Sequence, residues 1–282
     1  MIDGGIGGET LLFATPGDPI AQVRLPLVMG PVFAALGINA VWVPMHADRK
    51  GLHTVLEAIR TIRNFRGITV AIPHKIAVLD MVDDVSDVAR AAGAVNLVRR
   101  EPDGTLFGDM ADGAGFVRGL ELQGHSVRGA SVWLIGAGGG GAAIAAALAE
   151  AGVARIAITE TDRDRGAHVI ERLGRFYPHL VVELTANCEA AVDYAINATP
   201  CGLQPDDPPP FDPRPLGDST VVCDIIMKPR ETALLLAARR CGLAVHHGQH
   251  MLDAQIPMYL RFFGFPVVDE AAVIAMASRV PA

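Results

Sequence analysis

A chain of 282 residues exceeds the usual size of one domain, about 100–200 residues, so two domains are expected. Its formal net charge of −7 argues against a protein that neutralises nucleic-acid phosphates or an anionic membrane surface. No apolar run reaches the roughly 18 residues that a membrane helix needs. The four cysteines are widely spaced, with no CxxC pair, which indicates the reduced thiols of a cytoplasmic protein. The expected partner is a small molecule, and neither nucleic acid nor a membrane.

The first part of the chain alternates short apolar runs with amphipathic stretches. Strands are expected at residues 10–15, 40–44 and 67–72, and helices at 25–36, 50–64, 75–82 and 84–91. Two further strands, 94–99 and 105–107, bracket the turn Glu101-Pro102-Asp103-Gly104 and predict a hairpin at the edge of the sheet. This βαβ pattern is typical of a mostly parallel sheet with helices on its faces.

A second βαβ series follows a helix expected at 113–122. Its strands are expected at 131–135, 155–159, 181–184, 194–197, 221–225 and 243–246, and its helices at 141–151, 163–173 and 232–241. The proline-rich segment 204–215 is expected to be a surface loop, because proline cannot donate to a sheet ladder. The tail, 250–279, is expected to be mainly helical. The predicted fold class is therefore α/β.

A glycine-rich turn connects the buried strand 131–135 to an alanine-rich helix. In Gly136-x-Gly138-x-x-Gly141 the first glycine allows a tight turn, the second lets a pyrophosphate approach the backbone, and the third lets helix and strand pack closely. The helix N-terminus faces the negative charge. The alternative is a turn that only packs helix on sheet. The predicted dinucleotide contacts are Gly136, Ala137, Gly138, Gly139 and Gly141.

Carboxylates follow the next strand, about 20 residues after the turn. Glu160, Thr161 and Asp162 stand where a carboxylate accepts hydrogen bonds from the ribose hydroxyls of NAD, whereas a 2′-phosphate would favour an arginine. Glu160 therefore favours NAD. Arg163 and Arg165 follow closely and could instead bind a phosphate, so NADP stays open. A helix start alone also explains acidic residues here.

Lys75 and Asp112 are the candidates for proton transfer. Lys75 follows the strand 67–72, and ligands prefer the carboxyl ends of parallel strands. Asp112 lies in Gly108-Asp109-Met110-Ala111-Asp112-Gly113, at the expected domain junction. A lysine beside a carboxylate in a cleft can exchange a proton with a hydroxyl or carbonyl. From spacing alone, a surface salt bridge is the commoner explanation.

Seven motifs occur together in the order and spacing of the shikimate/quinate dehydrogenase family, which the chain resembles over nearly its whole length. They are Gly17-Asp18-Pro19-Ile20-Ala21, Thr69-Val70-Ala71-Ile72-Pro73-His74-Lys75, Ala92-Gly93-Ala94-Val95-Asn96, the Gly108–Gly113 segment, the glycine turn, Asn197-Ala198-Thr199-Pro200-x-Gly202 and Met251-Leu252-x-Ala254-Gln255. The resemblance implies a substrate domain, 1–112 completed by 249–282, and a Rossmann domain, 113–248. It also implies a C-terminal helix that returns to the first domain.

The resemblance assigns roles residue by residue. Members of the family move hydride between a nicotinamide and the ring carbinol of a hydroaromatic acid. A homodimer is compatible with the sequence. Lys75 and Asp112 match the catalytic pair, and Asn96 and Gln255 match groups that hold ring hydroxyls. Cofactor contacts are expected at Asn197, Thr199, Ile225 and Gly248, and Glu160-Thr161-Asp162 is similar to the acidic version of NAD-using members.

The chain departs from the family where the substrate carboxylate is usually held. The family has two hydroxyl residues in a Ser-x-Ser or Ser-x-Thr element, but Val23-Arg24-Leu25 stands here. Each unmet bond costs roughly 1–3 kcal/mol, so shikimate should bind poorly. Gln22 and Arg24 are candidates for a replacement anion site, and the alternative is a solvent-facing Arg24 at a helix start. Thr69, at the family's Asn, is also a candidate substrate contact.

The remaining expectations concern the histidines and rival functions. His246, His247 and His250 are close in sequence, but without further ligands at metal spacing they are interpreted as loop packing, and no metal is expected. The working hypothesis is a divergent member that acts on a less hydroxylated, or differently placed, cyclic hydroxy acid or alcohol. Its rivals are a true shikimate dehydrogenase, a non-catalytic sensor of a hydroaromatic acid and a nucleotide, and a methyltransferase.

Overall fold

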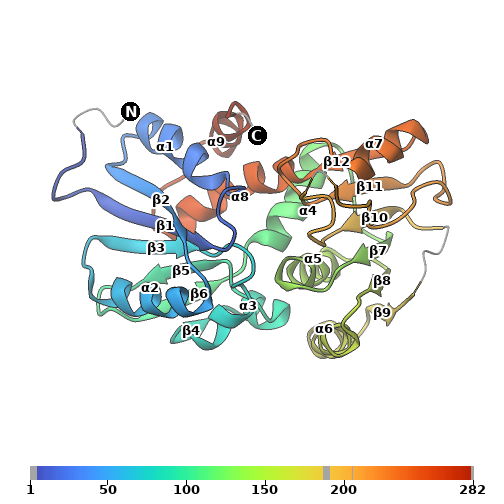
Figure 1. Ribbon diagram of the computed structural model, residues 1–282, viewed down its shortest axis with the longest axis horizontal. Helices are drawn as coiled ribbons and strands as arrows, with labels where there is room; N and C mark the ends of the chain where they lie inside the picture. Colours follow the sequence, from blue (N-terminus) through green and yellow to red (C-terminus); the bar gives the residue numbers. More distant parts are fainter. Residues whose placement is uncertain (1–4, 187–190, 205, 281–282) are drawn as a thin grey trace. The chain divides into compact units, whose positions relative to one another are not determined.

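The computed structural model describes residues 5–186, 191–204 and 206–280. These divide into two compact units, each with its own sheet (Figure 1). The described residues of the first unit fall within Met1–Arg90, Ala94–Ala111 and Asp253–Pro281, and those of the second within Ala91–Gly93 and Asp112–Leu252. Helix α8 (Gly248–Phe262) contains the last boundary between these units, because the C-terminal segment of the first unit begins at Asp253. The described helices include none that is long and apolar enough to cross a membrane.

The sheet of the first unit has six strands in the order β2-β1-β3-β5-β6-β4. They are β1 (Leu11–Gly17), β2 (Ala40–His46), β3 (Phe65–Thr69), β4 (Asp84–Val85), β5 (Leu97–Arg100) and β6 (Leu106–Asp109). The three strands β2, β1 and β3 run parallel, whereas β5 pairs antiparallel with both β3 and β6. The sheet is therefore mixed, because a tight hairpin needs antiparallel strands.

The predicted hairpin turn is confirmed, but its place in the sheet is not. Gly104 has φ +94, which favours glycine, and its N–H donates to the carbonyl of Glu101. The short strand β4 pairs with β6, so β4 and not the hairpin forms the edge. Residues 84 and 85 were expected to begin a helix. That helix, α3, spans Asp87–Ala92 instead, because Val85 pairs with the sheet and the Ser86 hydroxyl accepts from the N–H of Ala89.

Helices and an aromatic core complete the first unit. Its other helices are α1 (Leu25–Ala35), α2 (Arg49–Thr61), the one-turn 3-10 helix Ala77–Asp80 within the expected helix 75–82, and α9 (Glu270–Ser278). Helix α2 starts at Asp48, whose side chain accepts from the N–H of Gly51, and it buries Leu52, Leu56 and Ile59 at helical spacing. The Phe13 ring stacks on Trp42 with ring centroids 5.0 Å apart. Burying each such side chain contributes about 1.5–3 kcal/mol.

The sheet of the second unit is entirely parallel, in the order β12-β11-β10-β7-β8-β9. Its strands are β7 (Ser131–Ile135), β8 (Arg155–Thr159), β9 (Val181–Leu184), β10 (Tyr194–Asn197), β11 (Val221–Asp224) and β12 (Ala244–His247), and its helices are α4 (Asp112–Leu122), α5 (Gly139–Glu150), α6 (Arg163–Phe176) and α7 (Ala233–Arg240). The strand order reverses beside β7. In such sheets a ligand binds at this switch point, outside the carboxyl ends of the strands.

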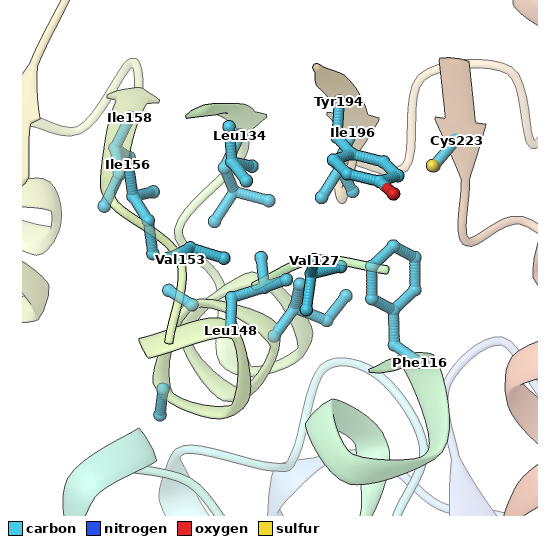
Figure 2. Packing of buried hydrophobic residues seen from close by; sticks show 14 of the residues in the cluster. Phe116, Val127, Leu134, Leu148, Val153, Ile156, Ile158, Tyr194, Ile196 and Cys223 are labelled. Carbon is cyan, nitrogen blue, oxygen red and sulfur yellow. The ribbon is translucent and has the colours of Figure 1, made fainter. Parts of the chain in front are cut away.

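The core of the second unit lies between the sheet and its helices. Leu134, Ile158 and Ile196 project from neighbouring strands toward Leu148 of α5 and Phe116 of α4 (Figure 2). Each is at most 1% exposed. This packing fixes the strand end from which the glycine turn departs.

Candidate functional site

The glycine turn meets the packing demands that its sequence predicts. Gly136 has φ +97, and a Cβ there would lie 2.9 Å from the carbonyl oxygen of Ala198. A Cβ on Gly141 would lie 2.0 Å from the carbonyl oxygen of Gly136. Both positions therefore require glycine for the close contact of turn, strand and helix.

The space above the turn fits a pyrophosphate. Apart from Gly138 and its two chain neighbours, no heavy atom of the described residues lies within 4 Å of where a Cβ on Gly138 would stand, so a ligand can approach this backbone closely. Helix α5 begins at Gly139, and the amides of a helix's first turn have no intrahelical acceptor. Glycine at 138 therefore has no packing reason in the described residues, and the turn suits a dinucleotide.

Glu160 is held beside this turn by a dense set of donors. Its carboxylate accepts from the N–H of Ala137 at 2.8 Å and from the Arg165 Nη2 at 2.8 Å, and its side chain is 5% exposed. The Thr161 hydroxyl and the N–H of Asp162 also donate to it. Burial acts to raise the pKa of Glu160, but these hydrogen bonds outweigh it and lower the pKa to about 2. An ionised carboxylate thus stands at the tip of β8, next to the turn.

Arg165 and Asp162 support Glu160. Asp162 is the N-cap of α6, where its side chain accepts from the N–H of Arg165. This cap sets the start of the helix, and the Arg165 guanidinium then returns to Glu160 through both Nε and Nη2. The structure therefore brings Ala137, Glu160, Thr161, Asp162 and Arg165 together beside the glycine turn.

Asn197 and Thr199 form a buried network at the end of β10. The Asn197 Oδ1 accepts from both the N–H and the hydroxyl of Thr199, and its Nδ2 donates to Asp224. Burial raises the pKa of Asp224 to about 6, although bonds from Ile226, Thr232 and Asn197 act to lower it. Sequence reasoning gave Asp224 no role. Its position at the end of a parallel strand was the available signal.

Ile225 and Gly248 line the same edge of the sheet. The Ile225 Cδ1 lies 3.5 Å from where a Cβ on Gly140 would stand, so Ile225 faces the glycine turn. A Cβ on Gly248 would lie 2.5 Å from the carbonyl of Ile225, so this position also requires glycine. The structure therefore groups Thr199, Ile225 and Gly248 around the turn that the sequence predicts to bind a dinucleotide.

The histidines pack against one another. His246 is 1% exposed, and its Nδ1 lies 3.3 Å from the Nδ1 of His250. Its Nε2 has no hydrogen-bond partner among the residues that the structure describes. Burial, followed by the charges of His250, His125 and His247, lowers the pKa of His246 to about 3. His247 instead bonds to Glu231 at 2.7 Å. Within residues 5–186, 191–204 and 206–280, no group of three potential ligands is placed to hold a metal ion.

In the first unit, Lys75 lies in the loop after β3. The side chain is half-buried, and the Lys75 carbonyl accepts from the N–H of Val95. Its neighbour His74 is buried and bonds through Nε2 to the carbonyl of Ala47 at 2.7 Å, which fixes the loop. Asp112, 3% exposed, is the first residue of α4 in the second unit.

Asn96 and Gln255 are joined by a tyrosine that sequence reasoning missed. The Asn96 Nδ2 donates to the hydroxyl of Tyr259 at 3.5 Å, and that hydroxyl donates to the Gln255 Oε1 at 2.5 Å. Thr69 is also buried, and its hydroxyl bonds to the Thr15 hydroxyl at 2.7 Å. Gln255 and Tyr259 are one helical turn apart, which was the only sequence signal for this contact.

The structure corrects the expectations for Arg24. Its guanidinium donates to Asp253 at 2.8 Å and to the carbonyls of Ala277 and Val280, and the residue is 5% exposed. Both terminal nitrogens of the guanidinium donate to groups of the protein itself, so Arg24 is neither a replacement anion site nor a solvent-facing residue. The amide of Gln22 donates to the carbonyl of Pro19.

The residues at the family's hydroxyl positions, Val23 and Leu25, are half-buried and buried. Leu25 is 5% exposed and begins α1. An open cavity of about 540 Å³ lies at the ends of β1 and β2, lined by residues that include Asp18, His46 and Thr54. The His46 Nε2 lies 2.9 Å from Asp18. The cavity thus offers a neutral or acidic lining.

Comparisons with known proteins identify the family. The family model described as the shikimate dehydrogenase substrate binding domain matches residues 16–98. The "Shikimate dehydrogenase (NADP(+))" of Rubrobacter xylanophilus is 38% identical over 88% of this chain and 88% of its own. The chain belongs to the shikimate dehydrogenase family. It is an oxidoreductase that acts on a CH–OH group with a nicotinamide coenzyme.

Two solved structures with a similar fold are named for different activities. The 5-ketofructose reductase of Gluconobacter sp. is 28% identical, with a TM-score of 0.83 over 97% of this chain and 100% of that one. The quinate dehydrogenase of Corynebacterium glutamicum, solved with NAD, is 30% identical, with a TM-score of 0.82 over 95% of this chain and 98% of that one. These relatives confirm the α/β fold of a substrate domain and a Rossmann-like domain.

Proposed function

We propose that this protein is a divergent dehydrogenase that interconverts the ring hydroxyl and ketone of a cyclic hydroxy acid or alcohol without a carboxylate anchor at residues 23–25. The buried ion pair between Arg24 and Asp253 is the observation that carries this proposal. This ion pair holds Arg24, the cation of the segment Val23–Leu25, within the protein, and the side chains of Val23 and Leu25 have no hydrogen-bond donor. A substrate carboxylate would gain nothing there.

We propose Lys75 and Asp112 as the proton-transfer pair. The coenzyme supplies the hydride acceptor or donor at the reacting carbon. The neutral amine of Lys75 would bond the hydroxyl of that carbon and receive its proton when the alcohol is oxidised, and the resulting ammonium would return the proton when the ketone is reduced. Asp112 would stabilise the ammonium. The support for these roles is the family resemblance at both positions.

NAD is the proposed preferred coenzyme. Glu160 is ionised and lies beside the glycine turn, where a carboxylate binds ribose hydroxyls and repels a 2′-phosphate. The Rubrobacter relative is named for NADP(+), and the Corynebacterium structure contains NAD. Arg165, paired to Glu160, leaves NADP as a weaker alternative. The cytoplasm, as expected for reduced thiols, is the proposed location.

A neutral substrate is also compatible with this site. The name of the Gluconobacter enzyme denotes a keto sugar, which has hydroxyls and ketones and no carboxylate. A site without an anion receptor at residues 23–25 is suited to such a compound. We therefore include uncharged ring alcohols and ketones among the proposed substrates.

True shikimate dehydrogenase is the second candidate. The 38% identity to a shikimate dehydrogenase over 88% of the chain supports it. In that case the carboxylate of shikimate would be bound by residues other than Val23–Leu25. A non-catalytic sensor is a third and weaker candidate, because a sensor has no need of both Lys75 and Asp112.

An absorbance assay at the nicotinamide band tests the proposal. Shikimate, quinate, and uncharged ring alcohols would each be offered with NAD and with NADP. The proposal expects turnover of other ring alcohols or acids in preference to shikimate and quinate. Efficient turnover of shikimate or quinate would instead support the true family activity. No turnover, together with measurable NAD binding, would support the sensor.

A further inference from the structure

Tyr259 lies between the two amide side chains that are proposed to contact the substrate ring. Asn96, Gln255 and Tyr259 are 2%, 1% and 3% exposed. The Tyr259 hydroxyl accepts from the Asn96 Nδ2 at 3.5 Å and donates to the Gln255 Oε1 at 2.5 Å. One hydroxyl thus bridges both amides.

The direction of these hydrogen bonds is fixed by the backbone. The N–H of Ala111 donates to the Asn96 Oδ1 at 2.8 Å, so the Asn96 Nδ2 is the atom that faces Tyr259. The phenol must then accept from Asn96 and is left with its proton for Gln255. A hydroxyl on a ligand ring would make the same pair of bonds, as acceptor from one amide and donor to the other.

We infer that Tyr259 is a specificity-determining residue, whose hydroxyl occupies the position of one substrate hydroxyl between Asn96 and Gln255. This inference rests on the proposed function together with the family resemblance, which assigns these two amides to substrate hydroxyls. Because the phenol ring also fills the space, a substrate with a hydroxyl on this side must displace a buried side chain and two hydrogen bonds. The protein therefore selects ring compounds with one hydroxyl fewer at this position.

The position of Tyr259 in α8 makes the arrangement rigid. Tyr259 follows Gln255 by four residues, so the two side chains share one face of the helix. Tyr259 and the neighbouring Leu260 are both buried, at 3% and 1% exposure. The ring therefore cannot swing into solvent without disturbing the core.

Equilibrium binding of two uncharged probes tests the inference without relying on catalysis. Cyclohexane-1,2-diol and cyclohexane-1,2,3-triol would be titrated into the NAD-saturated protein and followed by ligand-observed NMR. Uncharged probes remove the effect of the missing carboxylate anchor. For Tyr259→Ala, the affinity ratio of triol to diol is expected to rise at least tenfold over the wild type. Tyr259→Phe is the matched control, in which the ring still fills the space and the ratio stays within about threefold.

The outcomes separate this inference from the proposed function. An unchanged ratio in a Tyr259→Ala protein that keeps its NADH affinity would overturn the inference. If Tyr259→Ala does not fold, Tyr259→Ser gives the same opening with a small polar side chain and the same expected rise. A shifted ratio with no oxidation of any ring alcohol by the wild type would support the inference and contradict the proposed function.

Discussion

Replacement of Glu160 by alanine should exchange the coenzyme preference. The Glu160 carboxylate is held by Ala137, Asp162 and both side-chain nitrogens of Arg165 that face it. Bonds of ribose hydroxyls to a charged acceptor contribute about 1.5–3 kcal/mol each, and part of this is lost to competition with Arg165. A net loss of about 2 kcal/mol raises the Kd of NADH about 30-fold.

The same change releases Arg165 for a 2′-phosphate. A guanidinium pairs a phosphate through charge-assisted bonds, so a gain of about 1.4 kcal/mol, or tenfold in the Kd of NADPH, is expected. Both constants can be measured by quenching of protein fluorescence during titration with the reduced coenzymes. Glu171→Ala is the matched control, because it removes an exposed carboxylate from α6, the helix that carries Arg165, where Glu171 pairs with Arg175. If Glu160→Ala leaves the ratio of the Kd of NADH to the Kd of NADPH unchanged, the reasoning is refuted.

Three further predictions concern catalysis, the fold and pH. Lys75→Ala should lower kcat at least about 100-fold while the Kd of NADH stays within about twofold, and steady-state rates near those of the wild type would exclude the proposed proton transfer. Arg24→Ala should lower the free energy of unfolding by about 3–5 kcal/mol in a denaturant titration, because it leaves Asp253 buried without its cation; a loss below 1 kcal/mol would contradict a structural role. The pKa of His246 is lowered to about 3 in the folded state, so the unfolded chain binds a proton that the folded chain does not, and stability falls as the pH drops below the unfolded value. From pH 6.5 to pH 5 this costs about 2 kcal/mol in urea unfolding, and a His246→Asn protein with the same slope as the wild type would show that another group is responsible.

Local patterns predicted much of the fold from the sequence. The turn Gly136–Gly141, the cap at Asp162 and the hairpin at Gly104 were predictable because each depends on backbone geometry within a few residues. The edge strand β4 was missed. Its two residues carry no periodicity, and only pairing with β6 defines it.

The roles of Arg24 and Tyr259 could not be predicted from the sequence, because they depend on contacts between residues that are distant in the chain. Arg24 meets Asp253, 229 residues away, and this ion pair removes Arg24 from any role with an anion. The role inferred for Tyr259 depends on its hydrogen bond with Asn96, which is 163 residues away. Such partners have no signature in local spacing. Glu160 shows the intermediate case, in which the position was predicted from the motif but the bond to Ala137 required the structure.

The most direct test of the central claim compares a ring acid with its uncharged ester. Steady-state kcat/KM would be measured for shikimate and for methyl shikimate with saturating NAD, at substrate concentrations high enough to detect weak turnover. If no carboxylate anchor exists at Val23–Leu25, the two values should agree within about threefold, since one anchoring bond to a charged group contributes at least about 1.5 kcal/mol, or more than tenfold. A preference for the acid above tenfold would contradict the account and show that this protein holds the carboxylate by another receptor.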